Sequence, residues 1–233
     1  MYGFTYRSFS VTLLIRFTCS TTCFSPTFVQ EDGVVLDPLQ FTVLKAKVAV
    51  NPLLMPTTDD DPKKKSIIWN VLFDTNQAHL STDRSSRSWN EGRDEPATFP
   101  RLTSLRLCSP CFPWIIEVSN EHGVTCSDVL DKLFEFFNRI IDKAEWDSFP
   151  DPFKASVGTA YKWNRSTARG APGGRYYGPA IKRGDILRTY TVWKGLVCDE
   201  KYVADQMGTP PGCTLVVVLE SREPPPAIGA PPA

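Results

Sequence analysis

"TCSDVLDKLFEFFNRIID", residues 125–142, decides the fold of this chain. At 100° per residue, one face of a helix over this stretch is apolar. That face carries Val129, Leu130, Leu133, Phe134, Phe137, Ile140 and Ile141. The opposite face carries Asp128, Asp131, Lys132, Glu135, Asn138 and Arg139. Thr125 or Ser127 can cap the first turn, and Asp128 adds negative charge at the positive end of the helix dipole. An apolar face this wide predicts that the helix lies across a sheet.

Short apolar segments on both sides of this helix predict the strands of that sheet. They are residues 67–73, 102–107, 114–118, 186–197 and 214–219, and residues 34–50 could hold another. The segments "IIWNVLF" (67–73) and "TLVVVL" (214–219) are apolar on both faces, as buried strands are. In "WIIEV" (114–118), the side chains of Trp114, Ile116 and Val118 share one face.

The stretch "DPFKASVGTAYKWN" (151–164) predicts a second, shorter helix, with Asp151 as its candidate N-cap. We therefore expect an α+β fold in a single domain. Its antiparallel or mixed sheet has about five strands, with one long amphipathic helix packed on a face. Two strands that lead into such a helix resemble a β-grasp unit, although the insertions here are large.

Composition divides the chain into three parts. Residues 1–50 form a leader or poorly ordered extension, residues 51–222 the α+β domain, and residues 223–233 a disordered Pro-rich tail. The first 28 residues contain Ser, Thr, Arg7 and Arg16 but no acid, a composition shared with mitochondrial transit peptides.

Charge and cysteine usage narrow the classes of partner and compartment. The 26 basic and 26 acidic residues cancel, so no global field recruits nucleic acid or a membrane surface. No run approaches the roughly 20 apolar residues that a membrane span needs, and we expect no membrane partner. Seven scattered cysteines are untypical of a secreted disulfide scaffold. We expect an intracellular protein, in the cytoplasm or the nucleus.

The candidate reactive residues form no recognisable constellation. Cys108, Cys111, His122 and Cys126 resemble a zinc set, but the strand 114–118 separates the two pairs by about 25 Å. Neither His79 nor His122 belongs to a nucleophile motif. We predict no catalytic residue, no metal and no cofactor. The favoured function is a non-catalytic module that binds a protein partner, and an enzyme of unidentified type ranks third.

The basic segment 162–188 supports the alternative function. It contains "RSTARGAPGGRYYGPAIKRGD" (165–185), and its seven basic residues and one acid give a local net charge of +6. The candidate anion-binding residues are Arg165, Arg169, Arg175, Lys182 and Arg183, and the candidate stacking residues are Trp163, Tyr176 and Tyr177. Arginines with interleaved aromatic rings suit RNA or another polyanion. The simpler interpretation is a soluble loop whose arginines pair with acids elsewhere and whose Asp185 begins the following strand.

Several segments in a fixed order carry a family resemblance. They are "NPLL" at 51, "IIWNVLF" at 67, "PATFP" at 96, "PWIIEV" at 113, "VTCSDVLDKLFEFF" at 124 and "IKRGDILRTYTVWKGL" at 181. A last apolar strand follows them. Over roughly residues 50–221 the chain resembles domain of unknown function 6699, a family of mushroom-forming fungi. The resemblance implies one α+β domain and an intracellular fungal origin, and it implies no functional residue.

Overall fold

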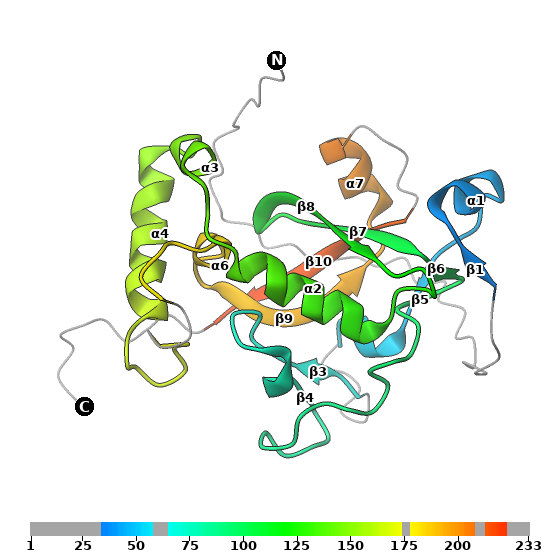
Figure 1. The fold of residues 1–233 in the computed structure, drawn as a ribbon, viewed down its shortest axis with the longest axis horizontal. Helices are drawn as coiled ribbons and strands as arrows, with labels where there is room; N and C mark the ends of the chain where they lie inside the picture. The colour runs from blue at the N-terminus through cyan, green and yellow to red at the C-terminus, as the bar shows by residue number, and fades with distance from the viewer. Residues whose placement is uncertain (1–33, 58–64, 174–177, 208–212, 223–233) are drawn as a thin grey trace. The chain divides into compact units, whose positions relative to one another are not determined.

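A four-stranded sheet in the order β8-β7-β10-β9 organises the fold (Figure 1). The computed structural model describes residues 34–57, 65–173, 178–207 and 213–222. Strands β7 (Ser104–Ser109) and β8 (Phe112–Ser119) form an antiparallel hairpin. Strand β10 (Thr214–Ser221) runs parallel to β7 and antiparallel to β9 (Tyr190–Val197). The sheet thus consists of a hairpin, a last strand that runs parallel to β7, and β9 at the edge.

The central position of β10 explains its apolar sequence. It lies between β7 and β9, and its side chains are buried on both faces from Thr214 to Val217. In β8 the side chains alternate, with Ile116 and Val118 buried and Ile115 exposed, as the sequence predicted. Strand formation here follows from burial on one or both faces of the pleat.

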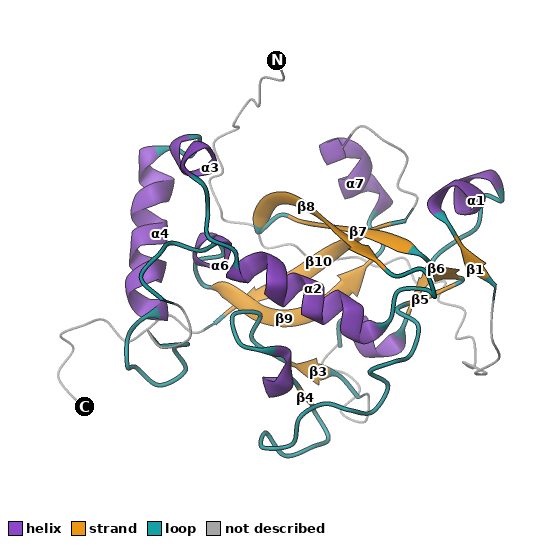
Figure 2. Cartoon of the chain, in the orientation of Figure 1, coloured by secondary structure: helices purple, strands orange, loops and turns teal. Residues whose placement is uncertain are grey.

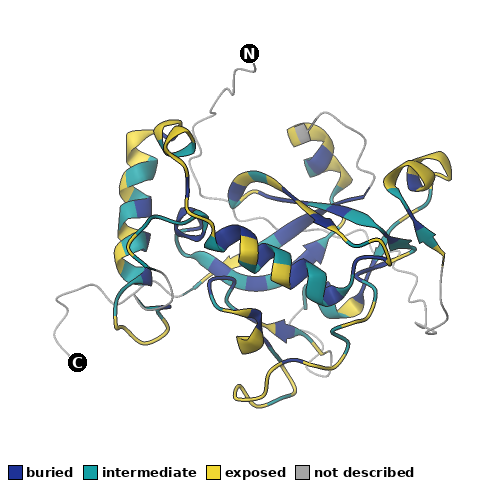
Figure 3. Cartoon of the chain, viewed as in Figure 1, coloured by how far each residue is buried: buried dark blue, intermediate teal, exposed yellow. Residues whose placement is uncertain are grey.

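Helix α2 (Cys126–Asn138) crosses one face of the sheet (Figure 1). Thr125 and Asp128 form a capping box at its start, in which each side chain accepts a backbone N–H of the other residue. Val129, Leu130, Leu133 and Phe137 are buried in the main core, as predicted. Buried residues follow the inner side of α2, and exposed ones follow its outer side (Figure 3).

The predicted end of this helix was wrong. The chain leaves the helix at Arg139, whose backbone is extended, so the 100° periodicity stops there. Ile140 is therefore exposed, whereas Ile141 enters a separate cluster with Phe149, Val157 and Ile186. Phe136, which the sequence did not place in the core, is buried against Trp114 at 5.5 Å between ring centroids.

The other helices of the described residues lie around the sheet (Figure 2). They are α1 (Pro38–Val43), α3 (Lys143–Asp147), α4 (Asp151–Asn164), α6 (Arg183–Ile186) and α7 (Glu200–Met207). Helix α4 has 14 residues against 13 in α2, so it is not the shorter of the two. Its N-cap is Pro150, and Asp151 is the first helical residue. No helix among the described residues is long and apolar enough to span a membrane.

Within the described ranges, six two-residue strands and two 3-10 turns complete the secondary structure. They are β1 (Val35–Leu36), β2 (Ala49–Val50), β3 (Ile67–Ile68), β4 (His79–Leu80), β5 (Thr98–Phe99), β6 (Arg101–Leu102), η1 (Pro52–Leu54) and η2 (Thr75–Gln77). Residues 67–73 thus form a strand only at Ile67–Ile68. The chain turns after it, because the side-chain oxygen of Asn70 accepts a hydrogen bond from the backbone amide of Leu72.

The segment after β3 still covers the outer edge of β9. The amide of Val71 donates to the carbonyl of Thr191 at 2.9 Å, and the amide of Trp193 donates to the carbonyl of Trp69 at 2.9 Å. Residues 34–50 hold α1, capped by Asp37, rather than one strand, because Asp37 and Pro38 start a helix. Their side chains Leu36 and Phe41 are buried in the main core. Residues 1–33 and 223–233 lie outside the described residues.

Candidate binding surface

Arg165 and Asp185, both from the basic segment, bind each other. Asp185 is fully buried, and its Oδ1 and Oδ2 atoms lie 3.0 and 3.2 Å from Nη1 and Nη2 of Arg165. Asn164 donates to the same carboxylate at 2.8 Å. Arg165 also donates to the carbonyl oxygens of Tyr161, Gly178 and Ala180, so this side chain ties the end of α4 to the chain before α6. The sequence predicted that Asp185 begins the following strand. This prediction was wrong, because Asp185 belongs to α6.

Arg183 and Lys182 also have partners inside the fold. The guanidinium of Arg183 pairs with Glu145 of α3 and lies 4.4 Å from the ring centroid of Phe136 and 5.2 Å from that of Trp114. Lys182 donates to the side chain of Asn138 at the end of α2. Burial and the nearby Arg165 guanidinium lower the pKa of Lys182.

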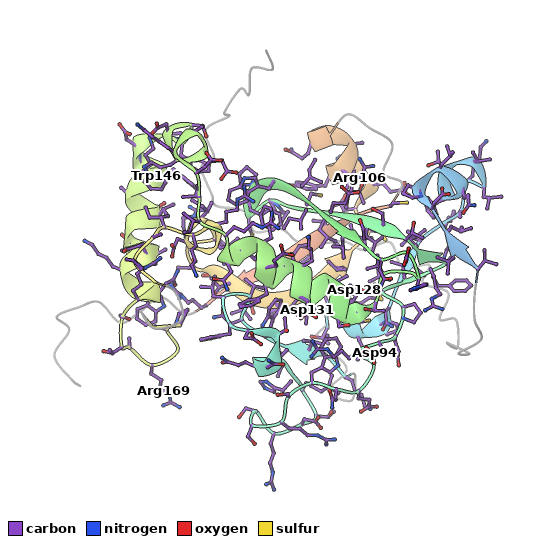
Figure 4. All side chains as sticks on the ribbon, in the orientation of Figure 1. Asp94, Arg106, Asp128, Asp131, Trp146 and Arg169 are labelled. Atoms are coloured by element: carbon purple, nitrogen blue, oxygen red, sulfur yellow. The ribbon has the colours of Figure 1, made fainter. Side chains whose placement is uncertain are left out.

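Of the other predicted site residues, Arg169 lies apart from this network and Trp163 lies beside it, because Arg222 donates to Asn164. Arg169 is exposed and projects from the loop after α4 (Figure 4). Trp163 lies beneath the guanidinium of Arg222, with 4.9 Å from Cζ to the ring centroid. Arg175, Tyr176 and Tyr177 lie outside the described residues. The structure therefore does not bring the described candidates into one exposed cluster, and anion binding by this segment stays a prediction.

Four cysteines in the described ranges have buried or half-buried thiols in unreactive surroundings. Burial raises the pKa of Cys108, Cys111, Cys126 and Cys213. A reactive thiol needs the opposite shift, because the thiolate is the nucleophile. In the part of the chain that the structure describes, no three His, Cys, Asp or Glu side chains gather as a metal site would require.

A groove lies on the face of the sheet opposite α2. Its floor comes from β7, β8 and β10, its first wall from residues 38–48 and its second wall from residues 198–200. Its volume is about 1010 Å³. Leu105, Leu107 and Leu215 point into the core beneath α2, so the residues that alternate with them face the groove. We call this feature the second-face groove.

Opposite charges line the two walls of the second-face groove. Lys45 and Lys47 lie on the first wall, and Asp199 and Glu200 on the second. The floor carries Arg106, Glu117, Ser104 and Thr214. Figure 4 shows Arg106 on β7, in the part of the sheet next to α7.

The backbone is strained at two points in this groove. Lys45 has φ 49° and Cys213 has φ 52°, two of the three non-glycine residues with positive φ in the described chain. This left-handed region costs a non-glycine residue free energy, and it is over-represented at functional sites. Sequence reasoning did not find this groove, because it assigned no role to Arg106 in the alternating segment 102–107 or to Thr214 in the apolar segment 214–219.

Comparison with known proteins gives a family but no activity. The model of the family of unknown function DUF6699 matches residues 67–206, more than half of the chain. No curated protein and no solved structure matches. The matched residues include β7, β8, α2 and β9 but not β10. The chain therefore belongs to the DUF6699 family of unknown function.

Proposed function

We propose that this chain is a non-catalytic module that binds a protein partner in the second-face groove. The observation that carries the proposal is an open groove with a basic wall and an acidic wall. Small-molecule sites are mostly apolar and enclose the ligand. A partner segment with charges of both signs can match both walls, and such complementarity fixes register and steers association.

The surface beside the first wall supports a protein partner. Leu39, Val43 and Leu44 of α1 and its C-cap are exposed by 73%, 70% and 64%. Figure 3 shows α1 as exposed over most of its surface. Contiguous exposed apolar side chains with charged neighbours are typical of protein interaction sites. Burial raises the pKa of Cys213 and so disfavours its thiolate form inside the groove. Because the thiolate is the nucleophilic form of cysteine, this supports a binding function over a catalytic one.

The proposed compartment is the cytoplasm or the nucleus of a mushroom-forming fungus. Cys108, Cys111, Cys126 and Cys213, which form no disulfide bond with one another, support a reducing compartment. The order of the family-like segments supports the fungal source.

Site-specific cross-linking tests this function. Lys47→p-benzoylphenylalanine places a photoreactive group on the first wall, and Lys143→p-benzoylphenylalanine places it on exposed α3 as the matched control. Irradiation in an extract of the source organism should give a discrete protein adduct for position 47 and none for position 143. Equal labelling at both positions, or no adduct at position 47, would contradict the proposal.

Binding of RNA or another phosphoanion through residues 162–188 is the alternative. Exposed Arg169 supports it, together with the local charge of the segment. A salt titration of single-stranded RNA binding tests it, because each phosphate contact adds about 0.7 to the slope of log affinity against log salt. Arg169→Gln should lower this slope. Lys143→Gln, in α3 and outside residues 162–188, should leave it unchanged. Absence of binding at about 20 mM salt would remove this alternative.

A further inference from the structure

Arg106 occupies the floor of the second-face groove. It is half-buried in β7, and its Cα partners are Glu117 on β8 and Thr214 on β10. Its backbone amide donates to the carbonyl of Cys213 at 2.8 Å. Among the described residues, no side chain forms an ion pair or a hydrogen bond with its guanidinium. A guanidinium carries five N–H donors and no acceptor, so carboxylate and carbonyl oxygens are its natural partners.

Thr214 provides an independent indication of a ligand. Thr214 is 5% exposed, and its Oγ1 atom has no hydrogen-bond partner in the described ranges. A buried hydroxyl without a partner costs free energy, and each such group in a native structure calls for an explanation. Thr214 lines the same groove as Arg106 on the adjacent strand, so the two side chains lie side by side on one face.

Two of the three acids of the groove already have partners. Asp199 accepts the amide of Tyr202 at 2.8 Å in the first turn of α7, and Glu117 accepts the hydroxyl of Ser104 at 3.2 Å. Arg106 and Glu117 are cross-strand neighbours, yet they form no ion pair. The unused hydrogen-bonding capacity of the floor is therefore on donor groups, and an acceptor with negative charge would satisfy it.

The surrounding charges select the kind of anion. Glu117, Asp199 and Glu200 line the groove together with three basic residues, so its formal net charge is zero. A phosphate with nearly two negative charges meets these three carboxylates at close range, whereas a carboxylate brings one charge. Arginine also matches the planar carboxylate with two parallel hydrogen bonds.

We propose that Arg106 and Thr214 form a subsite that binds a carboxylate group of the partner segment, from an Asp or Glu side chain or from a C-terminus. The guanidinium donates to the carboxylate oxygens, and the Thr214 hydroxyl donates to one of them. Lys45 and Lys47 on the first wall attract the acidic end of the segment. The assignment of this carboxylate to a protein partner rests on the proposed function, but the subsite itself binds free carboxylate.

Arginine Nε–Hε signals in two-dimensional NMR spectra test the subsite directly. The Arg106 signal is assigned by its loss in Arg106→Lys, and sodium acetate is titrated at constant ionic strength with chloride as the balancing anion. We expect a saturable shift of the Arg106 signal and only a small linear drift of the exposed Arg169 signal. Thr214→Val keeps the shape of the side chain and should weaken acetate binding about tenfold.

Three outcomes would overturn the subsite. They are a linear Arg106 shift equal to that of Arg169, unchanged acetate affinity in Thr214→Val, and tighter binding of inorganic phosphate than of acetate. The amide spectrum of Thr214→Val reports whether the variant is folded, and the Arg106 shift in wild type stands without that variant. Cross-linking at position 47 without acetate binding would reject the subsite and keep the proposed function. Acetate binding without a cross-linked protein would reject the proposed function and keep the subsite.

Discussion

The fully buried carboxylate of Asp185 accepts two hydrogen bonds from Arg165, at 3.0 and 3.2 Å. This bidentate pair joins α4 to α6 across 20 residues of sequence. Burying a charge is unfavourable unless the charge is paired and hydrogen-bonded. Each partner here therefore offsets the desolvation cost of the other. Part of the basic segment therefore stabilises the fold.

Removing one partner of this pair should destabilise the protein strongly. Arg165→Met leaves the Asp185 carboxylate buried without its cation, and we expect a loss of about 3–5 kcal/mol in the free energy of unfolding. Arg169→Met, in the exposed loop of the same segment, should change it by less than about 0.5 kcal/mol. Urea unfolding measures both, and similar losses in the two variants would show that the pair is not buried as described.

Two glycines should respond to alanine in opposite directions. A Cβ atom on Gly195 of β9, at φ +141°, would lie 2.5 Å from the carbonyl oxygen of Leu54 and 2.6 Å from the nitrogen of Pro56. Gly195→Ala should therefore lower the melting temperature sharply. Gly158 in α4 has no atom within 4 Å of such a Cβ, so Gly158→Ala should stabilise by about 0.5–1 kcal/mol. Calorimetry measures the melting temperature of both variants. An unchanged melting temperature in Gly195→Ala would contradict the packing of β9 on residues 54–56.

The inner face of α2 should be far more sensitive than its outer face. Phe137 is 1% exposed and packs edge-on against Phe112 at 5.4 Å between centroids. Phe137→Ala should cost about 3–5 kcal/mol. Glu135→Ala removes only exposed pairs with Lys132 and Arg139 and should cost about 0.5 kcal/mol. Equal shifts of the urea midpoint in the two variants would mean that α2 does not pack on the sheet.

The Cys126 thiol should make the fold sensitive to alkaline pH. Burial raises the pKa of this thiol, so it stays protonated in the folded chain while it ionises near its ordinary pKa of about 8.5 in the unfolded chain. Its stabilising contribution is complete below that pH and falls as the pH rises above it.

Between pH 9 and 11, Cys126→Ala should lose stability less steeply than wild type, by up to about 1.4 kcal/mol per pH unit. Alkylation at pH 8.5, followed by mass spectrometry, provides a second measurement. Cys126 should react at least about ten times more slowly in the folded chain than in the urea-unfolded chain. Identical pH slopes, or equal alkylation rates of Cys126 in the folded and unfolded chain, would contradict the burial of this thiol.

The sequence predicted the fold where periodicity and burial agree. The capped helix from Cys126, the alternation of Trp114, Ile116 and Val118, and the doubly apolar β10 each reflect contact with one continuous core. Ile140 was misplaced because nothing in the local pattern reveals that Arg139 turns the backbone. Long-range contacts end the helix there, including the bond from the amide of Ile141 to the carbonyl of Ile181.

The candidate site was harder to predict for a related reason. The charges of the basic segment suggested an exposed anion site, but the acids that pair with Arg165 and Arg183 come from Asp185 and from Glu145 in α3. The second-face groove joins residues from segments up to 177 positions apart, Pro38 to Leu215 being its extremes. Such a surface has no local motif, because strand order alone brings its residues together.

Exchange of the charges on the two groove walls tests the central claim most directly. Lys47→Glu combined with Glu200→Lys cancels the net charge of each wall, because Lys45 and Asp199 keep theirs; it also keeps the net charge of the protein and changes only exposed side chains. Lys143→Glu combined with Glu121→Lys makes the same exchange at exposed positions elsewhere. The measurement is quantitative mass spectrometry of proteins retained by each variant and by wild type. We predict that the exchange in the groove lowers retention of the partner that cross-links at position 47 at least about tenfold, equivalent to 1.4 kcal/mol, while the control exchange leaves it unchanged. Equal retention by all three proteins would contradict binding in the second-face groove.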